Sequence, residues 1–320
     1  MPRAGFASLI GRPNAGKSTL LNRMVGTKVA IVSDKPQTTR NRIVAVKNMP
    51  GGQIVFMDTP GIHRPLHRLN VRMVDAAVET LREVDVVALV FDASTRPGRG
   101  DEYVANLLKH LTTPVVLVLN KIDLVSKANL LPLMEKAQRW HSFASIVPVS
   151  AETGDGVDRL EQVLLDQLPE SDPVYPEDFL TDQAERTLVA EIVREKVLHH
   201  TRQELPFSTA VGVDQFDETE REPSTRSAGS GQGLLRLYCT IYVETESQKP
   251  IVIGRGGAMI KQIGTEARKE LEAFFGAKVF LDLRVKVDAD WRDNDRTLDD
   301  LGVAKAVRRP SRRGPGVPGR

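Results

Sequence analysis

Residues 11–18 read Gly-Arg-Pro-Asn-Ala-Gly-Lys-Ser and stand between an apolar run at residues 6–10 and an expected helix. Glycines at this spacing let the chain turn tightly out of a strand, so that several backbone N–H groups point to one centre. The helix N-terminus adds its positive dipole end at the same centre. The string therefore predicts a phosphate-holding loop and fixes the order strand, loop, helix at the start of the chain. A glycine-rich turn without a ligand is the alternative.

Each side chain of this loop has an expected role. Lys17 would reach the β- and γ-phosphates of a nucleotide, and Ser18 would ligate Mg²⁺. The residues that we expect to contact the nucleotide are Gly11, Arg12, Pro13, Asn14, Ala15, Gly16, Lys17, Ser18 and Thr19.

The first half of the chain alternates short β-branched runs with helical patterns, which is typical of a mostly parallel sheet covered on both faces. The runs lie at residues 6–10, 42–46, 53–57, 85–91, 114–119 and 146–149. A Met-Pro-Gly-Gly turn at residues 49–52 predicts that the second and third runs form an antiparallel hairpin.

Two further strings stand at strand ends. Asp58, Thr59, Pro60 and Gly61 follow the third run, where an acid can hold a Mg²⁺-bound water beside the phosphates. Residues 32–42 form a polar segment, in which a threonine hydroxyl can complete the Mg²⁺ shell while a γ-phosphate is present. We favour Thr39 over Thr38 for this ligand, although a structural cap would also use a threonine. The expected metal ligands are Ser18, Thr39 and Asp58, and the expected catalytic group is Lys17, Thr39, Asp58 and Gly61.

Asn120, Lys121, Ile122 and Asp123 follow the fifth run and predict the base. Guanine presents an N1–H and an N2 amine side by side, so one carboxylate can accept both, and adenine offers no such pair. We assign this role to Asp123. Asn120 would tie the loop to residues 11–18, and the stem of Lys121 would cover one face of the base. Ser150 and Ala151 would complete the site, with a backbone N–H near Ala151 aimed at the guanine O6.

The second half of the chain has a different order of expected helices and strands. Residues 168–178 contain three prolines and four acidic residues without periodicity, so we expect a linker at residues 169–181 between a nucleotide domain at 1–168 and an α+β domain at 182–302. The pattern predicts a helix at 182–201 and strands at 209–216, 234–244 and 279–287. Residues 217–233 would form a loop. Residues 303–320 carry six Lys/Arg and no acid, which predicts a disordered basic tail.

The run from Ile251 to Ile260 reads IVIGRGGAMI and resembles the core signature of a KH domain, V-I-G-x-x-G-x-x-I. In that module two helices meet at a GxxG loop that clamps the backbone of about four nucleotides of single-stranded RNA. Residues 233–290 carry nine Lys/Arg against eight Asp/Glu, so a shaped groove would dominate over bulk charge. The expected RNA contacts are Ile253, Gly254, Arg255, Gly256, Gly257, Ile260 and Lys261.

In their order and in their exact residues, these strings resemble the Era family of bacterial ribosome-assembly GTPases, along residues 3–301. The resemblance implies a GTPase that binds 16S ribosomal RNA near its 3′ end and assists small-subunit assembly. It implies Mg²⁺ as cofactor, peripheral association with the inner face of the plasma membrane, and K⁺ held at Asn14. Some relatives have a water-orienting glutamine where this chain has Ile62, so we expect slow intrinsic hydrolysis.

The composition limits the kinds of function and structure that the chain can have. A net charge of +2 is too small to imply nucleic acid by itself. One cysteine, Cys239, excludes a disulfide framework, is expected to be an inert core thiol and fits a reducing cytoplasm. No apolar stretch approaches the roughly 20 residues needed to span a bilayer. We expect a monomer.

Three alternatives remain open. The chain could be an RNA chaperone that uses GTP as a structural ligand, which γ-phosphate release would exclude. It could be a membrane-associated signalling switch that uses its KH module for protein contacts, which RNA crosslinking to the GxxG loop would exclude. A ribosome-assembly GTPase with tandem nucleotide domains is disfavoured, because the chain has one phosphate loop.

Overall fold

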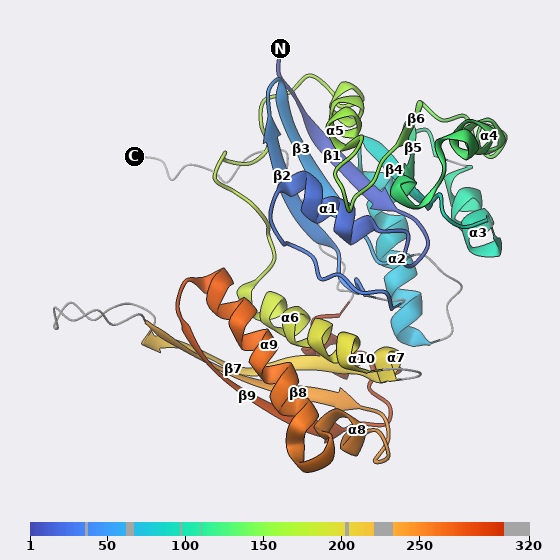
Figure 1. Cartoon of the computed structure of the whole chain (residues 1–320). Helices are drawn as coiled ribbons and strands as arrows, with labels where there is room; N and C mark the ends of the chain where they lie inside the picture. Colours follow the sequence, from blue (N-terminus) through green and yellow to red (C-terminus); the bar gives the residue numbers. More distant parts are fainter. Residues whose placement is uncertain are drawn as a thin grey trace, which may run out of the picture. The chain divides into compact units, whose positions relative to one another are not determined.

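The computed structural model describes residues 1–35, 38–61, 67–96, 98–109, 111–201, 205–220 and 233–303. Within these residues the chain forms two compact units, Met1–Asp182 and Gln183–Val303. Figure 1 shows that each unit is built around a sheet of its own. Each unit also has its own apolar core, so each is described by itself.

The first unit contains a six-stranded sheet in the order β2-β3-β1-β4-β5-β6. The strands are β1 Arg3–Ile10, β2 Ile43–Met49, β3 Gly52–Asp58, β4 Val86–Asp92, β5 Val115–Asn120 and β6 Ser145–Pro148. Strands β2 and β3 pair antiparallel across the predicted turn, and all other neighbours are parallel. The predicted α/β fold with a mostly parallel sheet is confirmed.

Helices cover both faces of this sheet, as Figure 1 shows. They are α1 Lys17–Val25, α2 Arg68–Glu83, α3 Arg99–Leu108, α4 Lys127–Ala137 and α5 Val157–Asp166, with a 3₁₀ turn η1 at Ile122–Leu124. Helices α1 and α5 share one core with Ala7 and Leu9, and α2, α3 and α4 share the other with Phe6 and Ile10. Because β1 alternates between two cores, its carboxyl end is held rigidly where the loop of residues 11–18 begins.

The expected linker at residues 169–181 is docked onto the first unit. Thr181 pairs with Ala45 of β2, and the N–H of Val46 donates to the carbonyl of Leu180 at 2.9 Å. The buried side chain of Gln53 accepts from the N–H of Val174 and of Tyr175 at 2.8 and 2.9 Å and donates to the carbonyl of Tyr175 at 2.9 Å. An aperiodic segment thus satisfies its backbone groups at the edge strand, which composition alone did not predict.

The second unit has a three-stranded sheet in the order β7-β8-β9, with β7 antiparallel and β9 parallel to β8. Its elements are α6 Glu185–His200, α7 Leu205–Ser208, β7 Ala210–Glu220, β8 Leu234–Val243, α8 Lys249–Ile253, a 3₁₀ turn η2 at Arg255–Gly257, α9 Ala258–Phe275, β9 Lys278–Val287 and α10 Asp295–Asp300. Apolar residues of α6 and α9 pack on one face of the sheet. The predicted α+β order of helix, two strands, helix, GxxG loop, helix and strand is confirmed.

Strand β7 is longer than predicted. Asp217 pairs with Arg236 and Glu220 with Leu234, across two register shifts. The polar residues 217–220 therefore belong to the strand, because β8 offers them backbone partners from Leu234 onward. Residues 221–232 and the basic tail at 304–320 lie outside the described residues.

The single cysteine lies on β8 among the core residues of the second unit, as expected for an inert thiol. Burial, with a contribution from Asp214, raises the pKa of Cys239 to about 12. Among the described residues, no helix is long and apolar enough to cross a membrane.

Candidate functional site

The loop between β1 and α1 opens into a cavity of about 370 Å³. Asn14 and Gly16 adopt left-handed backbone conformations with φ of 64° and 90°. A side chain at Gly16 would also lie 2.3 Å from the amide nitrogen of Asn120, so glycine is required here. The cavity lining includes the predicted nucleotide contacts Pro13, Asn14, Gly16, Lys17, Ser18, Thr19, Thr39, Gly61 and Lys121.

Lys17 is buried in the loop, where its ammonium donates to the carbonyls of Gly11 and Arg12 at 3.2 and 3.1 Å. Burial lowers the pKa of Lys17 to about 8, against the opposing charge of Asp58. Phosphate oxygens would supply a further negative charge beside this buried ammonium, so Lys17 is suited to hold a phosphate.

The three predicted metal ligands converge from three segments. The hydroxyls of Ser18 and Thr39 lie 2.7 Å apart, and Oδ2 of Asp58 lies 3.0 Å from the first and 3.4 Å from the second. Thr38 instead donates its hydroxyl to the carbonyl of Lys35 at 2.6 Å, as a turn residue does, which favours Thr39 as the ligand.

The carboxylate of Asp58 is fully buried, and its Oδ1 has no hydrogen-bond partner among the described residues. Burial raises the pKa of Asp58 to about 6, although Lys17 and the two hydroxyls oppose this. Mg²⁺ binds through few protein oxygens and keeps several waters. Two hydroxyls and an acid with an unused buried oxygen fit this requirement, so the residues present are suited to a magnesium ion.

The base loops are tied together by Asn120. Its amide nitrogen donates to the carbonyl of Ala15 at 2.9 Å, and its Oδ1 accepts from the N–H of Ala151 at 3.0 Å. The tie to the phosphate loop agrees with the prediction. The N–H of Ala151 is engaged with Asn120, because the buried amide oxygen needs a donor. The contact of a backbone N–H near Ala151 with the guanine O6 stays a prediction.

Asp123 is exposed, and among the described residues its carboxylate makes no hydrogen bond or ion pair. It stands in the turn η1 with both oxygens available for a ligand. Ser150 is buried and shapes the next loop, since its hydroxyl accepts from the N–H of Thr153 at 3.1 Å. Of the remaining predicted contacts, Thr59 and Pro60 are buried, while Ile62 lies outside the described residues.

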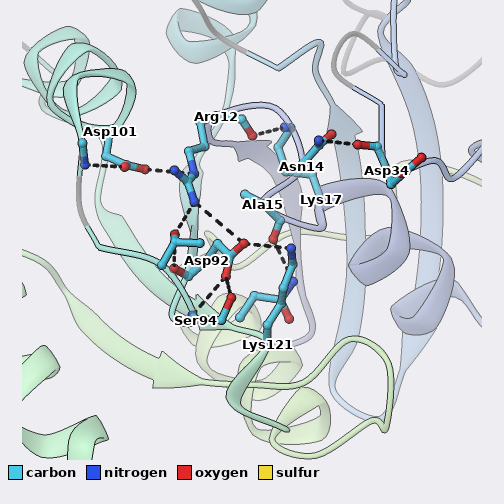
Figure 2. Close-up of polar contacts among 12 residues, drawn as sticks. Arg12, Asn14, Ala15, Lys17, Asp34, Asp92, Ser94, Asp101 and Lys121 are labelled. Atoms are coloured by element: carbon cyan, nitrogen blue, oxygen red, sulfur yellow. Dashed lines mark hydrogen bonds and ion pairs between the residues drawn. The ribbon is translucent and has the colours of Figure 1, made fainter. Parts of the chain in front are cut away.

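Two residues near the site were not predicted from sequence. Arg23 of α1 donates from Nε to the carbonyl of Ala151 at 3.0 Å and also donates to the carbonyl of Glu152, so it supports the loop that we assign to the base. Asp92 ends β4 and accepts from the ammonium of Lys121 at 2.8 Å (Figure 2). Asp92 could have been found from the sequence by its position, because it is an acid at a strand end like Asp58.

Figure 2 also shows that Arg12 points away from Lys17, toward Asp92 and Asp101. Its guanidinium donates to the hydroxyl of Thr95. Arg12 was expected among the nucleotide contacts, but its side chain does not line the cavity. Only its backbone faces that side, through the carbonyl that accepts from Lys17.

In the second unit, α8 and α9 meet at residues 254–257. Gly254 has φ of 76°, and a side chain there would lie 2.7 Å from the backbone nitrogen of Met259. Side chains at Gly256 and Gly257 would meet no atom within 4 Å, so these positions are open to a close ligand. Arg255 and Lys261 are exposed beside them, while Ile253 and Ile260 are half-buried. The loop thus has the predicted form.

Comparison with known proteins agrees with both halves of the chain. Residues 6–121 match the family described as 50S ribosome-binding GTPase, and residues 224–292 match the KH domain family. The fold and the site thus define a P-loop GTPase joined to a KH domain.

Similarity to characterised proteins extends over nearly the whole length. The chain is 49% identical to GTPase Era of Geobacter metallireducens and 47% identical to GTPase Era of Heliobacterium modesticaldum, each over 94% of this chain and 97% of the relative. The chain belongs to the GTPase Era family, and it is a GTPase. A crystal structure of Era in complex with MgGDPNP and nucleotides 1506–1542 of 16S ribosomal RNA has a TM-score of 0.88 and 41% identity, covering 94% of this chain and 99% of that one.

Proposed function

We propose that this GTPase binds small-subunit ribosomal RNA near its 3′ end through the GxxG loop and assists maturation of the small subunit under control of GTP. The observation that carries the proposal is that one chain combines the buried oxygen cluster of Ser18, Thr39 and Asp58 with an open GxxG loop. The similar Era structure that holds a 16S ribosomal RNA fragment supports this choice of RNA. The 50S description belongs to a broader family that matches only residues 6–121.

In the proposed nucleotide site, the loop at residues 11–18 encloses the phosphates and Lys17 neutralises the β- and γ-phosphate oxygens. Asp123 accepts the two guanine donors, and the stem of Lys121 covers the base. Ser18, Thr39 and Asp58 would hold Mg²⁺, which neutralises charge developing on the phosphates. A water attacks the γ-phosphorus, the bond to the β-γ bridging oxygen breaks, and GDP and phosphate result.

Thr39 is the proposed link between nucleotide state and structure. The residue is 6% exposed, and its hydroxyl lies among the proposed metal ligands, on the segment that leads into β2. Loss of the γ-phosphate removes the group that this segment is expected to close upon. GTP is then proposed to favour the RNA-competent state and GDP to favour release.

K⁺ is a further part of the proposal. The amide nitrogen of Asn14 donates to the carbonyl of Asp34 at 2.6 Å, which leaves the amide oxygen beside the cavity for a monovalent cation. Intrinsic hydrolysis without a glutamine is expected to be slow, so a cation near the phosphates would speed it. Equal turnover in K⁺ and Na⁺ buffers would remove this part.

The RNA proposal is tested by changing Arg255 and Gly256 together to Asp. Both positions are exposed, and an aspartate at Gly256 has open space but a strained left-handed backbone, so circular dichroism must show that the fold is kept. The RNA backbone would then meet added negative charge. We expect binding to a 16S 3′-end RNA fragment to be lost in an equilibrium binding assay, with GTP hydrolysis retained. Arg159→Asp reverses an exposed charge on α5 and serves as the matched control. Retained RNA affinity in the double variant would relocate the site.

The chaperone alternative predicts RNA binding that does not depend on nucleotide state. It is favoured if the GTP-bound and GDP-bound protein bind the fragment equally and no γ-phosphate is released under single-turnover conditions. The signalling alternative predicts no crosslink between RNA and residues 254–257. Action on ribosomal RNA would place the protein in the cytoplasm, and peripheral membrane contact stays a prediction of the family resemblance.

A further inference from the structure

Asp92 stands between two cations that come from the two ends of the nucleotide site. Its Oδ2 accepts from the ammonium of Lys121 at 2.8 Å and lies 3.8 Å from the guanidinium of Arg12 (Figure 2). Lys121 belongs to the base loop after β5, and Arg12 belongs to the phosphate loop after β1. One carboxylate therefore contacts both loops.

The carboxylate itself is held in place. Oδ1 of Asp92 accepts from the backbone N–H of Ser94 at 3.0 Å and from its hydroxyl at 2.5 Å. Asp92 ends β4 in register with Asn120 of β5, and the next N–H, of Ala93, donates to the carbonyl of Asn120 at 2.9 Å. Burial would raise the pKa of Asp92, but hydrogen bonds from Lys121 and Ser94 outweigh it and lower the pKa, so the group is an anion at neutral pH.

Holding the ammonium also places the stem of Lys121. The residue has a left-handed backbone with φ of 65°, and its Cε lies 3.9 Å from where a side chain on Gly16 would begin. The stem therefore crosses the end of the phosphate loop, and it lines the cavity. A lysine stem without such an anchor samples many rotamers, which ordering on binding would have to remove.

Arg12 is anchored on its other side. Its Nε lies 3.6 Å from Asp101, whose other oxygen accepts from the N–H of Gly98 at 3.0 Å at the start of α3. The hydroxyl of Thr95 accepts a further hydrogen bond from the guanidinium. The two cations thus differ: Arg12 keeps other partners if Asp92 is neutralised, whereas no other anion is found for Lys121 among the described residues.

We propose that Asp92 is a positioning residue for the nucleotide: by anchoring Lys121 beside Arg12 it fixes the stem that covers the base, and so sets how long the nucleotide stays bound without selecting the base. The inference rests on the proposed nucleotide site. Asp92 acts through Lys121 and does not touch the ligand.

The test is a double-mutant cycle on the full-length protein, read as the dissociation rate of fluorescent GDP. Asp92→Asn should raise the rate about tenfold, because a charged partner of a hydrogen-bonded pair is lost. Lys121→Met keeps an unbranched stem without charge. If Asp92 acts through Lys121, adding Asp92→Asn to Lys121→Met should change the rate by less than about twofold.

Three controls separate positioning from general damage. Asp92→Glu keeps the charge and should recover part of the slow dissociation. Asp101→Asn loosens Arg12 but not Lys121 and should have a smaller effect than Asp92→Asn. The preference for GDP over xanthosine diphosphate should not change in Asp92→Asn, since Asp123 is intact.

Equal effects of Asp92→Asn in the two backgrounds would overturn the proposal, as would an unchanged rate in Asp92→Asn alone. A general loss of structure would appear as a rate increase in both backgrounds. Failure of the proposed nucleotide site looks different, because the unmodified protein would then not bind fluorescent GDP in the first place.

Discussion

The proposed nucleotide site places a buried lysine and a buried aspartate among backbone groups. Burial lowers the pKa of Lys17 to about 8 and raises that of Asp58 to about 6, and each residue opposes the change in the other. Both charges are therefore disfavoured by folding, and a magnesium nucleotide would relieve both. Nucleotide affinity here is coupled to the stability of the unit that binds it.

Asp58→Asn should stabilise the nucleotide-free protein at pH 7 and abolish magnesium-dependent GTP binding. A pKa of about 6 in place of 3.8 means that the folded state holds this proton more tightly than the unfolded state. The contribution of Asp58 to stability is thus present below pH 4 and lost as the pH rises through 6. At pH 7 the free energy of unfolding should rise by up to about 3 kcal/mol in the variant.

Denaturant unfolding at pH 5 and pH 7 measures this effect, and calorimetry measures GTP binding. Asp34→Asn changes an exposed acid of the same region and should move stability by less than about 0.5 kcal/mol. If Asp58→Asn binds magnesium GTP as well as the unmodified protein does, the metal assignment is wrong.

Asp123→Asn should shift preference from guanine toward xanthine nucleotides. The amide can donate to the xanthine O2, whereas it cannot accept both guanine donors as the carboxylate does. We expect GTP affinity to fall by about tenfold to a thousandfold, as for loss of charged hydrogen bonds of 1.5–3 kcal/mol or more. Competition between GTP and xanthosine triphosphate measures it, with Asp155→Asn in the neighbouring loop as control. Unchanged GTP affinity would contradict the assignment of the base.

At this scale the sequence predicted residues that belong to motifs and missed those that depend on how loops meet. Ser18, Thr39 and Asp58 were expected together, since Ser18 and Asp58 come at the carboxyl ends of β1 and β3 and Thr39 precedes β2, which runs antiparallel to β3. Asp92 stands at such an end too, but its contact with Lys121 depends on the spacing of β4 and β5. The hydrogen bond from the N–H of Ala151 to Oδ1 of Asn120 was not predicted, because the meeting of these two loops is visible only in three dimensions.

Among the elements, the strands of the first unit were predictable because a sheet buried on both faces leaves continuous apolar runs. The docking of the linker was not predictable, because it depends on contacts with β2 and β3, among them those of Gln53, that are far apart in the sequence. Rings of Tyr175 and Phe179 stack at 4.2 Å and pack against the core on that face. A proline-rich composition is shared by free and docked segments, so the sequence carried no signal to separate them.

Gln53→Leu should release the linker. The side chain is fully buried and bonds three backbone groups of Val174 and Tyr175, which the leucine would leave unsatisfied. Unsatisfied buried groups cost about 1–3 kcal/mol each, so for three groups we expect a loss of at least about 3 kcal/mol in unfolding free energy. Limited proteolysis should then cut within residues 169–181. Gln162→Leu alters an exposed glutamine of α5 and should leave the cleavage rate unchanged.

Thr181 and Asp182 also form hydrogen bonds with the edge strand β2. Its Val44 donates its N–H to Asp182 at 3.3 Å, and its carbonyl accepts from the hydroxyl of Thr181 at 2.6 Å. The same strand continues from the segment of Thr39. The last residues of the first unit are therefore hydrogen-bonded to the strand that the segment of Thr39 enters.

For the whole molecule, the separate apolar cores of the two units predict that the units unfold in separate transitions. The first unit holds the proposed nucleotide site and the second holds the GxxG loop. Magnesium GDP at a hundred times its dissociation constant should add about 2.7 kcal/mol to the unit that binds it. Scanning calorimetry should show two transitions, of which GDP raises one. In Lys17→Ala that rise should disappear while RNA binding by the isolated C-terminal domain persists, and a rise in both transitions would show that the units unfold together.

The buried thiol of Cys239 can report, through its chemical labelling, on opening of the second unit. It is the only cysteine of the 320 residues, and its thiol reacts as a thiolate only once it meets water. Labelling by a maleimide should therefore proceed no faster than the KH sheet opens, whatever happens at the nucleotide. The labelling rate would measure how fast the second unit opens in the intact protein, with or without RNA. No engineered reporter would be needed.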